Sequence, residues 1–357
     1  MRTEGTGHPP GQPSVSGSTP WQRWWTVGGS LVGLLALAWI AWLIDVERLL
    51  TTLRNAQPAY LLVLIAALAA EQLVRAWKWR QILHEIRPVP TLRLFEVIMA
   101  GYLANILIPL GISPFVRAWL VARLEHLRMS AVLATVAIER LVDGIVFTGF
   151  VALVLLAAPF PDPGGRIGIG LTIAGVGTLA LLAGIVALLV WYKRRTRALT
   201  DGLLRLLHRF PAGLRTRIEG LMQAFAGGIV WPRAHWRRAA IILASTVMKL
   251  ISVSYFLWAG LAFGVALAPL AYVFLLVFAG FSYIIAHAAR VPGGFIVGSI
   301  FALRLLDVGK EEAAAIVLTV QIASMATVAA FGALALWRHG IALAQLRAVP
   351  RPDERSA

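Results

Sequence analysis

Six long apolar stretches constrain the fold of this chain more than any other feature. They cover residues 27–44, 58–77, 130–157, 167–192, 239–263 and 313–337. A helix that crosses about 30 Å of hydrocarbon needs roughly 20 apolar residues, because each residue adds about 1.5 Å. Since 59% of the residues are apolar and only 14% are charged, the chain has too little polar surface for a water-soluble globule. The sequence predicts an all-α polytopic membrane protein.

Two further apolar regions are each interrupted near the middle by proline and glycine. Region 92–124 contains the run Pro109-Leu-Gly-Ile-Ser-Pro114, and region 270–306 contains Pro292-Gly293-Gly294. A helix break exposes backbone polar groups, and hydrocarbon offers them no partner, so such breaks need protein or water around them. We expect two re-entrant broken-helix hairpins that enter from opposite faces, as in an inverted-repeat transporter. Breaks that serve only as kinks or packing devices are the alternative.

The positions of lysine and arginine decide between topologies. If both interrupted regions are re-entrant and the N-terminus is inside, 25 of the 33 basic residues lie in cytoplasmic segments, 11 of them in residues 193–238. A single crossing by region 92–124 would place those 11 outside, against the positive-inside bias. We therefore expect about six to eight transmembrane helices, with both termini in the cytoplasm. The net charge of +16 is then a matter of topology, and no nucleic-acid partner is needed to explain it.

The segments outside the apolar stretches differ in character. Residues 1–20 are rich in Gly, Pro, Ser and Thr and are expected to form a disordered cytoplasmic tail, and residues 341–357 a second tail. Residues 193–238 form a basic loop, in which apolar residues at spacings of three and four around Pro211 predict two amphipathic helices on the cytoplasmic surface. An anchor on anionic lipid is the plainer interpretation of these helices, and binding of a partner protein is the alternative.

Ionisable residues inside an apolar stretch are the sharpest functional signal. Each costs roughly 2.5–3.5 kcal/mol at the centre of a spanning helix. Stretch 130–157 carries Glu139, Arg140 and Asp143; the two carboxylates share a face, and Arg140 is three residues from Asp143 and can pair with it. Small residues at a spacing of four continue below and allow close approach of another helix: Gly144, Thr148 and Ala152. The cluster is either an ion pair that fixes packing or a headgroup or proton site.

Other polar residues near the two breaks complete a candidate pathway. Arginine binds phosphate bidentately, so Arg117 and Arg290 suit an anionic headgroup. Snorkelling to the interface is the alternative for Arg117 and Lys249, and a hydrogen-bonded core position is the alternative for His287. The candidate lipid-binding residues are Asn105, Pro109, Arg117, Glu139, Arg140, Asp143, Lys249, His287, Arg290, Pro292, Gly293 and Gly294.

Several classes of chemistry have no sequence signal. The chain has no cysteine, its seven histidines lack metal-ligand spacing, and no phosphate-binding P-loop is present. We therefore predict no catalytic constellation, no metal site and no cofactor, and any transport would be passive or driven by a gradient.

Several motifs occur in the order found in one known family. The runs Asn105-Ile-Leu-Ile-Pro109, Arg117-Ala and Ile138-Glu139-Arg140-Leu-Val-Asp143 resemble the central signature of the lysylphosphatidylglycerol synthase transmembrane region, or flippase-like domain family. Arg75-Ala-Trp-Lys78-Trp79 and Val291-Pro292-Gly293-Gly294 resemble its second-helix motif and its late hairpin. The resemblance covers roughly residues 27–340, so we assign residues 21–340 to one flippase-like transmembrane domain without the soluble aminoacyl-transferase domain of fused members.

The resemblance implies a multi-pass protein of the bacterial inner membrane that moves a phospholipid or other polar lipid between leaflets. Its partners would be membrane lipids, together with a membrane protein or a second copy of the chain. The chain departs from the family pattern at Gly111, Ser113, Pro114, Ile296, Ser299 and Gln321. These departures make a polyisoprenoid- or hopanoid-type lipid an alternative to an anionic phospholipid. Two alternative functions are an enzyme acting on lipid headgroups, with Glu139 or Asp143 as general base, and a non-transporting accessory subunit.

Overall fold

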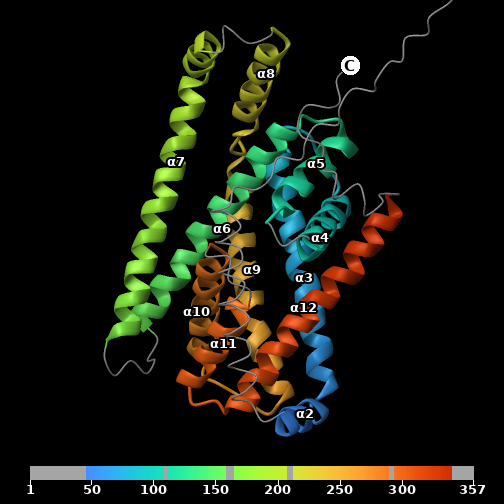
Figure 1. Cartoon of the computed structure of the whole chain (residues 1–357), viewed down its shortest axis with the longest axis vertical. Helices are drawn as coiled ribbons and strands as arrows, with labels where there is room; N and C mark the ends of the chain where they lie inside the picture. Colours follow the sequence, from blue (N-terminus) through green and yellow to red (C-terminus); the bar gives the residue numbers. More distant parts are fainter. Residues whose placement is uncertain (1–45, 108–110, 158–164, 207–211, 289–292, 340–357) are drawn as a thin grey trace, which may run out of the picture.

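The described part of the chain is a bundle of α-helices (Figure 1). The computed structural model describes residues 46–107, 111–157, 165–206, 212–288 and 293–339. Within these ranges the helices are α2 Val46–Arg54, α3 Pro58–Leu83, α4 Thr91–Leu107, α5 Ser113–Glu125, α6 Met129–Ala157, α7 Arg166–Leu206, α8 Ala212–Gly228, α9 His235–Ala262, α10 Pro269–Ala288, α11 Gly294–Leu305 and α12 Lys310–Arg338. The predicted all-α fold class is confirmed.

Six helices in the described ranges are long and apolar enough to cross a membrane. They are α3, α6, α9, α12, the first 31 residues of α7 (Arg166–Thr196) and the first 18 of α10 (Pro269–Ala286). Five of them match predicted stretches, while the predicted stretch 27–44 lies outside the described residues. Helix α3 continues to Leu83, six residues beyond the predicted end of its apolar stretch. The extension adds Lys78 to a candidate spanning helix.

The first interrupted region folds into two antiparallel helices, α4 and α5. At their open end Arg93 Nη1 lies 2.5 Å from Glu125 Oε1. Further along, a Cβ added to Gly101 would lie 2.6 Å from Arg117 Cγ, so the missing side chain at this position lets the two helices meet. Gly111, just before α5, has φ of 69°, a left-handed conformation that glycine adopts without strain.

The second interrupted region also folds back on itself, as α10 and α11. The rings of Phe278 and Phe301 lie 5.7 Å apart, and a Cβ on Gly294 would collide with Ala286. Gly293 immediately precedes α11 with φ of 81°. Two adjacent glycines are therefore required for different reasons, the first by backbone conformation and the second by close packing. Pro109 and Pro292 lie outside the described residues.

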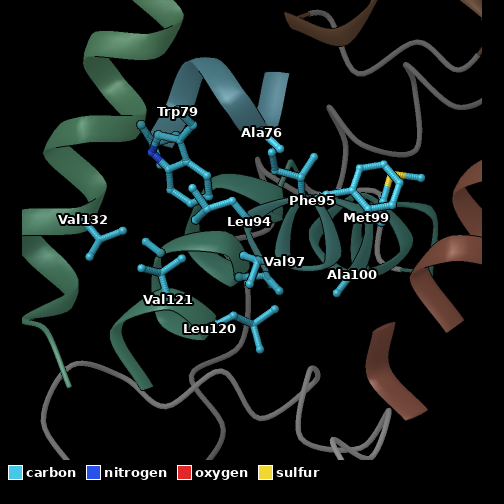
Figure 2. Packing of buried hydrophobic residues seen from close by; sticks show 14 of the residues in the cluster. Ala76, Trp79, Leu94, Phe95, Val97, Met99, Ala100, Leu120, Val121 and Val132 are labelled. Atoms are coloured by element: carbon cyan, nitrogen blue, oxygen red, sulfur yellow. The ribbon is translucent and has the colours of Figure 1, made fainter. Parts of the chain in front are cut away.

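Two apolar clusters stabilise opposite ends of the bundle. The first lies between the end of α3, the start of α6 and the α4–α5 pair; Figure 2 shows Trp79, Leu94 and Leu120 packed within it. The second joins the start of α3 and the end of α6 to α9, α10, α11 and α12. Between the two clusters, α3 and α6 carry buried charged residues.

Helices α7 and α8 stand beside this bundle, joined to it through α6 (Figure 1). Gly144 of α6 faces Leu182 of α7, as the predicted close approach requires. Helix α8 contacts both neighbours: Arg128 Nη1 donates to Gly220 O at 3.2 Å, and Tyr192 OH donates to Met222 O at 2.9 Å. Of the two predicted amphipathic stretches, the first is described up to Leu206, where it is the end of α7 and not a separate helix, and the second is α8.

Close packing of α12 against α4 gives a stability prediction. A Cβ on Gly332 would lie 2.7 Å from Leu103 Cβ and 2.8 Å from Met99 O. Gly332→Ala is therefore expected to lower the free energy of unfolding by about 1–3 kcal/mol, although alanine favours helix. Gly177 in α7 has nothing within 4 Å of an added Cβ, so Gly177→Ala should be neutral or stabilising by up to about 1 kcal/mol. Thermal unfolding in detergent distinguishes the two signs, and equal effects would contradict the packing argument.

Candidate functional site

Three polar residues on one face of α3 begin the site. Glu71, Arg75 and Lys78 are separated by four and three residues, so they lie above one another on the helix. All three side chains are buried, and Arg75 Nη2 lies 2.7 Å from Glu71 Oε1. They occupy the region of α3 between Leu68 of the second apolar cluster and Trp79 of the first. A charged layer thus crosses the bundle between its two apolar ends.

Asp143 of α6 forms ion pairs with two residues of α3 and accepts a hydrogen bond from a hydroxyl group of α9. Lys78 Nζ lies 2.5 Å from Asp143 Oδ1, and Arg75 Nη1 lies 3.4 Å from Asp143 Oδ2. Ser245 Oγ donates to Asp143 Oδ1 at 2.9 Å. The predicted pairing of Asp143 with Arg140 is wrong: Arg140 is exposed, and the described ion pairs of Asp143 are made by α3. The side chain of Asp143 points across to a neighbouring helix, which the spacing within α6 did not reveal.

Glu139 binds Arg117 in the interior of the bundle. Arg117 Nη2 donates to Glu139 Oε2 at 2.6 Å, and its guanidinium lies 4.3 Å from the centre of the Trp79 ring. Both charged side chains are completely buried, so the snorkelling alternative for Arg117 is wrong. Glu139 Oε1 lies 3.7 Å from Arg75 Nη1 and 3.8 Å from Lys78 Nζ but accepts no hydrogen bond from a described residue. Arg117 Nε and Nη1 likewise have no acceptor among the described residues.

Glu71 extends the layer toward α9. Ser252 Oγ donates to Glu71 Oε2 at 3.1 Å, and Tyr255 OH donates to the same oxygen. Tyr255 also lines a cavity of about 300 Å³ between α3, α9, α10, α11 and α12. The polar groups on the cavity wall include Gln321 and Ser324 of α12. A space of the size of a small polar headgroup therefore adjoins the charged layer.

Lys249 gives the layer an excess of positive charge. Its ammonium lies 5.5 Å from the centre of the Phe147 ring, and Asp143 and Glu71 act on it electrostatically. Within the described residues it makes no ion pair with a carboxylate. The central charged cluster, as we call it, comprises three carboxylates and four cations: Glu71, Glu139, Asp143, Arg75, Lys78, Arg117 and Lys249.

Three residues of the cluster lie at the midpoints of long helices. Asp143 is the central residue of α6, and Glu71 and Lys249 lie at the centres of α3 and α9. If these helices cross a bilayer, these charges lie at the depth where burial of charge is most costly. Mutual pairing offsets part of this cost, but the fourth cation has no carboxylate to itself. A singly charged anion would balance the cluster.

The structure brings together only some of the predicted site residues. Arg117, Glu139, Asp143 and Lys249 belong to the central charged cluster. Asn105 is half-buried in α4, with no hydrogen-bond partner for Oδ1 in the described chain. Gly293 and Gly294 shape the turn into α11. Arg140 is exposed on α6 and stands outside the cluster. Three candidates lie outside the described residues: Pro109, Arg290 and Pro292. The side chain of His287 is not described.

Sequence reasoning named Lys249 of α9 but missed the polar residues of α3 and the hydroxyl groups of α9. Arg75 and Lys78 were counted among the 25 cytoplasmic basic residues, whereas the structure places both, with buried side chains, in a candidate spanning helix. The signal was the spacing of Glu71, Arg75 and Lys78, which places three charges on one helical face. Ser252 and Tyr255 had no such signal, because a lone hydroxyl in an apolar helix is common.

Comparison with known proteins assigns the chain to a family. A search of curated proteins and of solved structures gives no match. The family model of the lysylphosphatidylglycerol synthase TM region matches residues 26–332, which include every residue of the central charged cluster. The chain therefore belongs to the lysylphosphatidylglycerol synthase TM region family.

Proposed function

We propose that this protein is a lipid flippase or lipid transporter that moves a polar lipid with an anionic headgroup between leaflets. The observation that carries the proposal is the central charged cluster, in which four cations from α3, α5 and α9 face three carboxylates of α3 and α6 inside the bundle. A phosphate would supply the missing negative charge and would accept from the free N–H groups of Arg117. The adjoining cavity of about 300 Å³ offers space for the remainder of the headgroup.

The two antiparallel helix pairs support a route to the cluster from both sides. In Figure 1 the α4–α5 pair lies toward the upper end of the bundle, and the α10–α11 pair lies in its lower half. We propose that they are re-entrant hairpins related as an inverted repeat, with the upper end in the cytoplasm of a bacterium and the membrane being the inner one. The basic residues of α8 and of the α4–α5 pair support this orientation.

The geometry favours transport over chemistry on the headgroup. A general base needs an oxygen that is available to accept a proton. Both oxygens of Asp143 face cations. Glu139 Oε1 accepts no hydrogen bond from a described residue, but it lies 3.7 Å from Arg75 Nη1 and 3.8 Å from Lys78 Nζ, and two neighbouring cations make a carboxylate a weaker base. Lipid translocation needs no such base and uses the cations directly.

Lys249→Gln tests the proposal with little risk to the fold, because Lys249 makes no ion pair with a described carboxylate. The substitution removes the excess cation, so translocation of fluorescent phosphatidylglycerol in proteoliposomes should fall about tenfold. Translocation of a zwitterionic lipid, if it occurs, should fall less. The rate of loss of fluorescence after addition of a membrane-impermeant quencher measures both.

Lys310→Gln is the matched control. Lys310 is exposed at the start of α12, where it lies 3.9 Å from Glu311, and its loss should leave the rate unchanged. Equal translocation by wild-type protein, Lys249→Gln and empty vesicles would refute the transport proposal. In that case the accessory-subunit alternative would gain support from a stable partner in a mild-detergent pull-down.

A further inference from the structure

A groove on the outer side of α6 stands apart from the central charged cluster. It has a volume of about 620 Å³ and lies between α6, α7 and the segment that follows α8. Its α6 wall is formed by Ile138, Leu141 and Ile145, which lie on a different face of that helix from Glu139 and Asp143. Its α7 wall is formed by Val186, Leu189 and Val190. The groove thus presents aliphatic side chains from two helices.

The charged residues of the groove lie at one end. Lys193 and Arg194 follow the aliphatic positions of α7, and no aspartate or glutamate lines the groove. Lys193 Nζ donates to Ile229 O and keeps two further N–H groups, while Arg194 is exposed. One end of the apolar groove is therefore formed by two adjacent cations, with no carboxylate among the residues that line the groove.

The depth of the groove matches one leaflet. Residues 167–192 of α7 contain no charge, so Lys193 is the first charged residue after the apolar span. Trp191, Tyr192 and Trp231 lie beside it, and aromatic residues of this kind gather at the level of lipid headgroups. From Val186 to Arg194 the helix rises about 12 Å, close to the roughly 15 Å of one leaflet of hydrocarbon.

We infer that this groove binds one anionic phospholipid of the leaflet at the α8 end, with an acyl chain along α6 and α7 and the phosphate between Lys193 and Arg194. The argument from charge selects this occupant. A segment such as residues 27–44 contains no acidic residue and would leave both cations without a partner. A phospholipid can place its acyl chain against the apolar walls and its phosphate beside the two cations. The inference does not depend on translocation, because α6 lies between the groove and the central charged cluster.

Lipid retention by purified protein tests the headgroup half of the site. In nanodiscs containing equal phosphatidylglycerol and phosphatidylcholine, native mass spectrometry after release should show phosphatidylglycerol retained preferentially. The double variant Lys193→Gln, Arg194→Gln should retain about tenfold less phosphatidylglycerol, with phosphatidylcholine unchanged. Arg195→Gln, an exposed neighbour that does not line the groove, should retain as much as wild type. Equal losses in Arg195→Gln would show a general effect of surface charge and would overturn the inference.

Filling the groove tests the acyl-chain half. Leu189→Trp should reduce phosphatidylglycerol retention, whereas Leu181→Trp, which is exposed on α7 outside the groove, should not. If these variants fold poorly, a milder substitution tests the site. Compared with the wild type, Trp231→Phe should show less fluorescence quenching by brominated phosphatidylglycerol but the same quenching by brominated phosphatidylcholine. Equal quenching in wild type and Trp231→Phe would refute the site. A dimer that Leu189→Trp dissociates would instead identify a second copy as the occupant and would also overturn the inference.

Discussion

Asp143→Asn is expected to lower the free energy of unfolding by about 3–5 kcal/mol. The substitution leaves the ammonium of Lys78, which is completely buried, without the carboxylate that lies 2.5 Å away. Glu139 compensates only in part, because its Oε1, 3.8 Å from Lys78 Nζ, already faces Arg75 and its Oε2 binds Arg117. Unfolding by sodium dodecyl sulfate in mixed micelles measures the loss.

A second substitution separates the cost of an unpaired charge from the cost of a lost contact. Lys78→Met in the Asp143→Asn background removes the buried cation and should restore about half of the lost free energy or more. Glu311→Gln is the control, because its ion pair with the exposed Lys310 is long, at 3.9 Å, and its effect should stay below about 0.5 kcal/mol. If the double variant is less stable than Asp143→Asn alone, the cation is not the source of the cost.

Arg117→Gln is expected to cost about 3–5 kcal/mol for the corresponding reason at the other carboxylate. It removes the hydrogen bond of 2.6 Å to Glu139 and the stacking on Trp79. Arg123→Gln on the same helix is a matched control: Arg123 lies 5.4 Å from the centre of the Trp119 ring but is exposed, so its loss should cost less than about 1 kcal/mol.

A double variant at Arg117 and Glu139 should recover stability but not transport. Arg117→Gln with Glu139→Gln removes one charge of each sign, so most of the stability should return. Translocation should not return, because a cation proposed to receive the headgroup is gone. Thermal unfolding and the proteoliposome assay on the same preparations measure the two effects. Recovery of both would assign Arg117 a structural role only.

The family of the chain was predicted from its motifs, and the match over residues 26–332 confirms it. Apolar stretches gave five of the six candidate spans, because hydrocarbon thickness dictates the length of a spanning helix regardless of its neighbours. The turns in the interrupted regions also followed from local chemistry. Gly293 adopts a left-handed φ, and a Cβ on Gly294 has no room beside Ala286.

The partners of the buried charges could not be predicted in the same way. The spacing within α6 favoured a pair between Arg140 and Asp143, yet Asp143 is bound by Lys78 and Arg75 of α3. The two residues of each pair are more than 60 positions apart in the sequence. Only the packing of α3 against α6 decides which of the available cations reaches the carboxylate.

The sequence by itself thus determined the helical fold, five of the six candidate spans, the family and the presence of costly charge on α6. The tertiary structure decided that Arg75 and Lys78 belong to the core, that Arg140 does not, and that α9 supplies Lys249 and three hydroxyl groups to the same layer. The physical reason is the range of each interaction. Hydrophobic length and backbone conformation act along the chain, whereas an ion pair is made only where separate helices meet within about 4 Å.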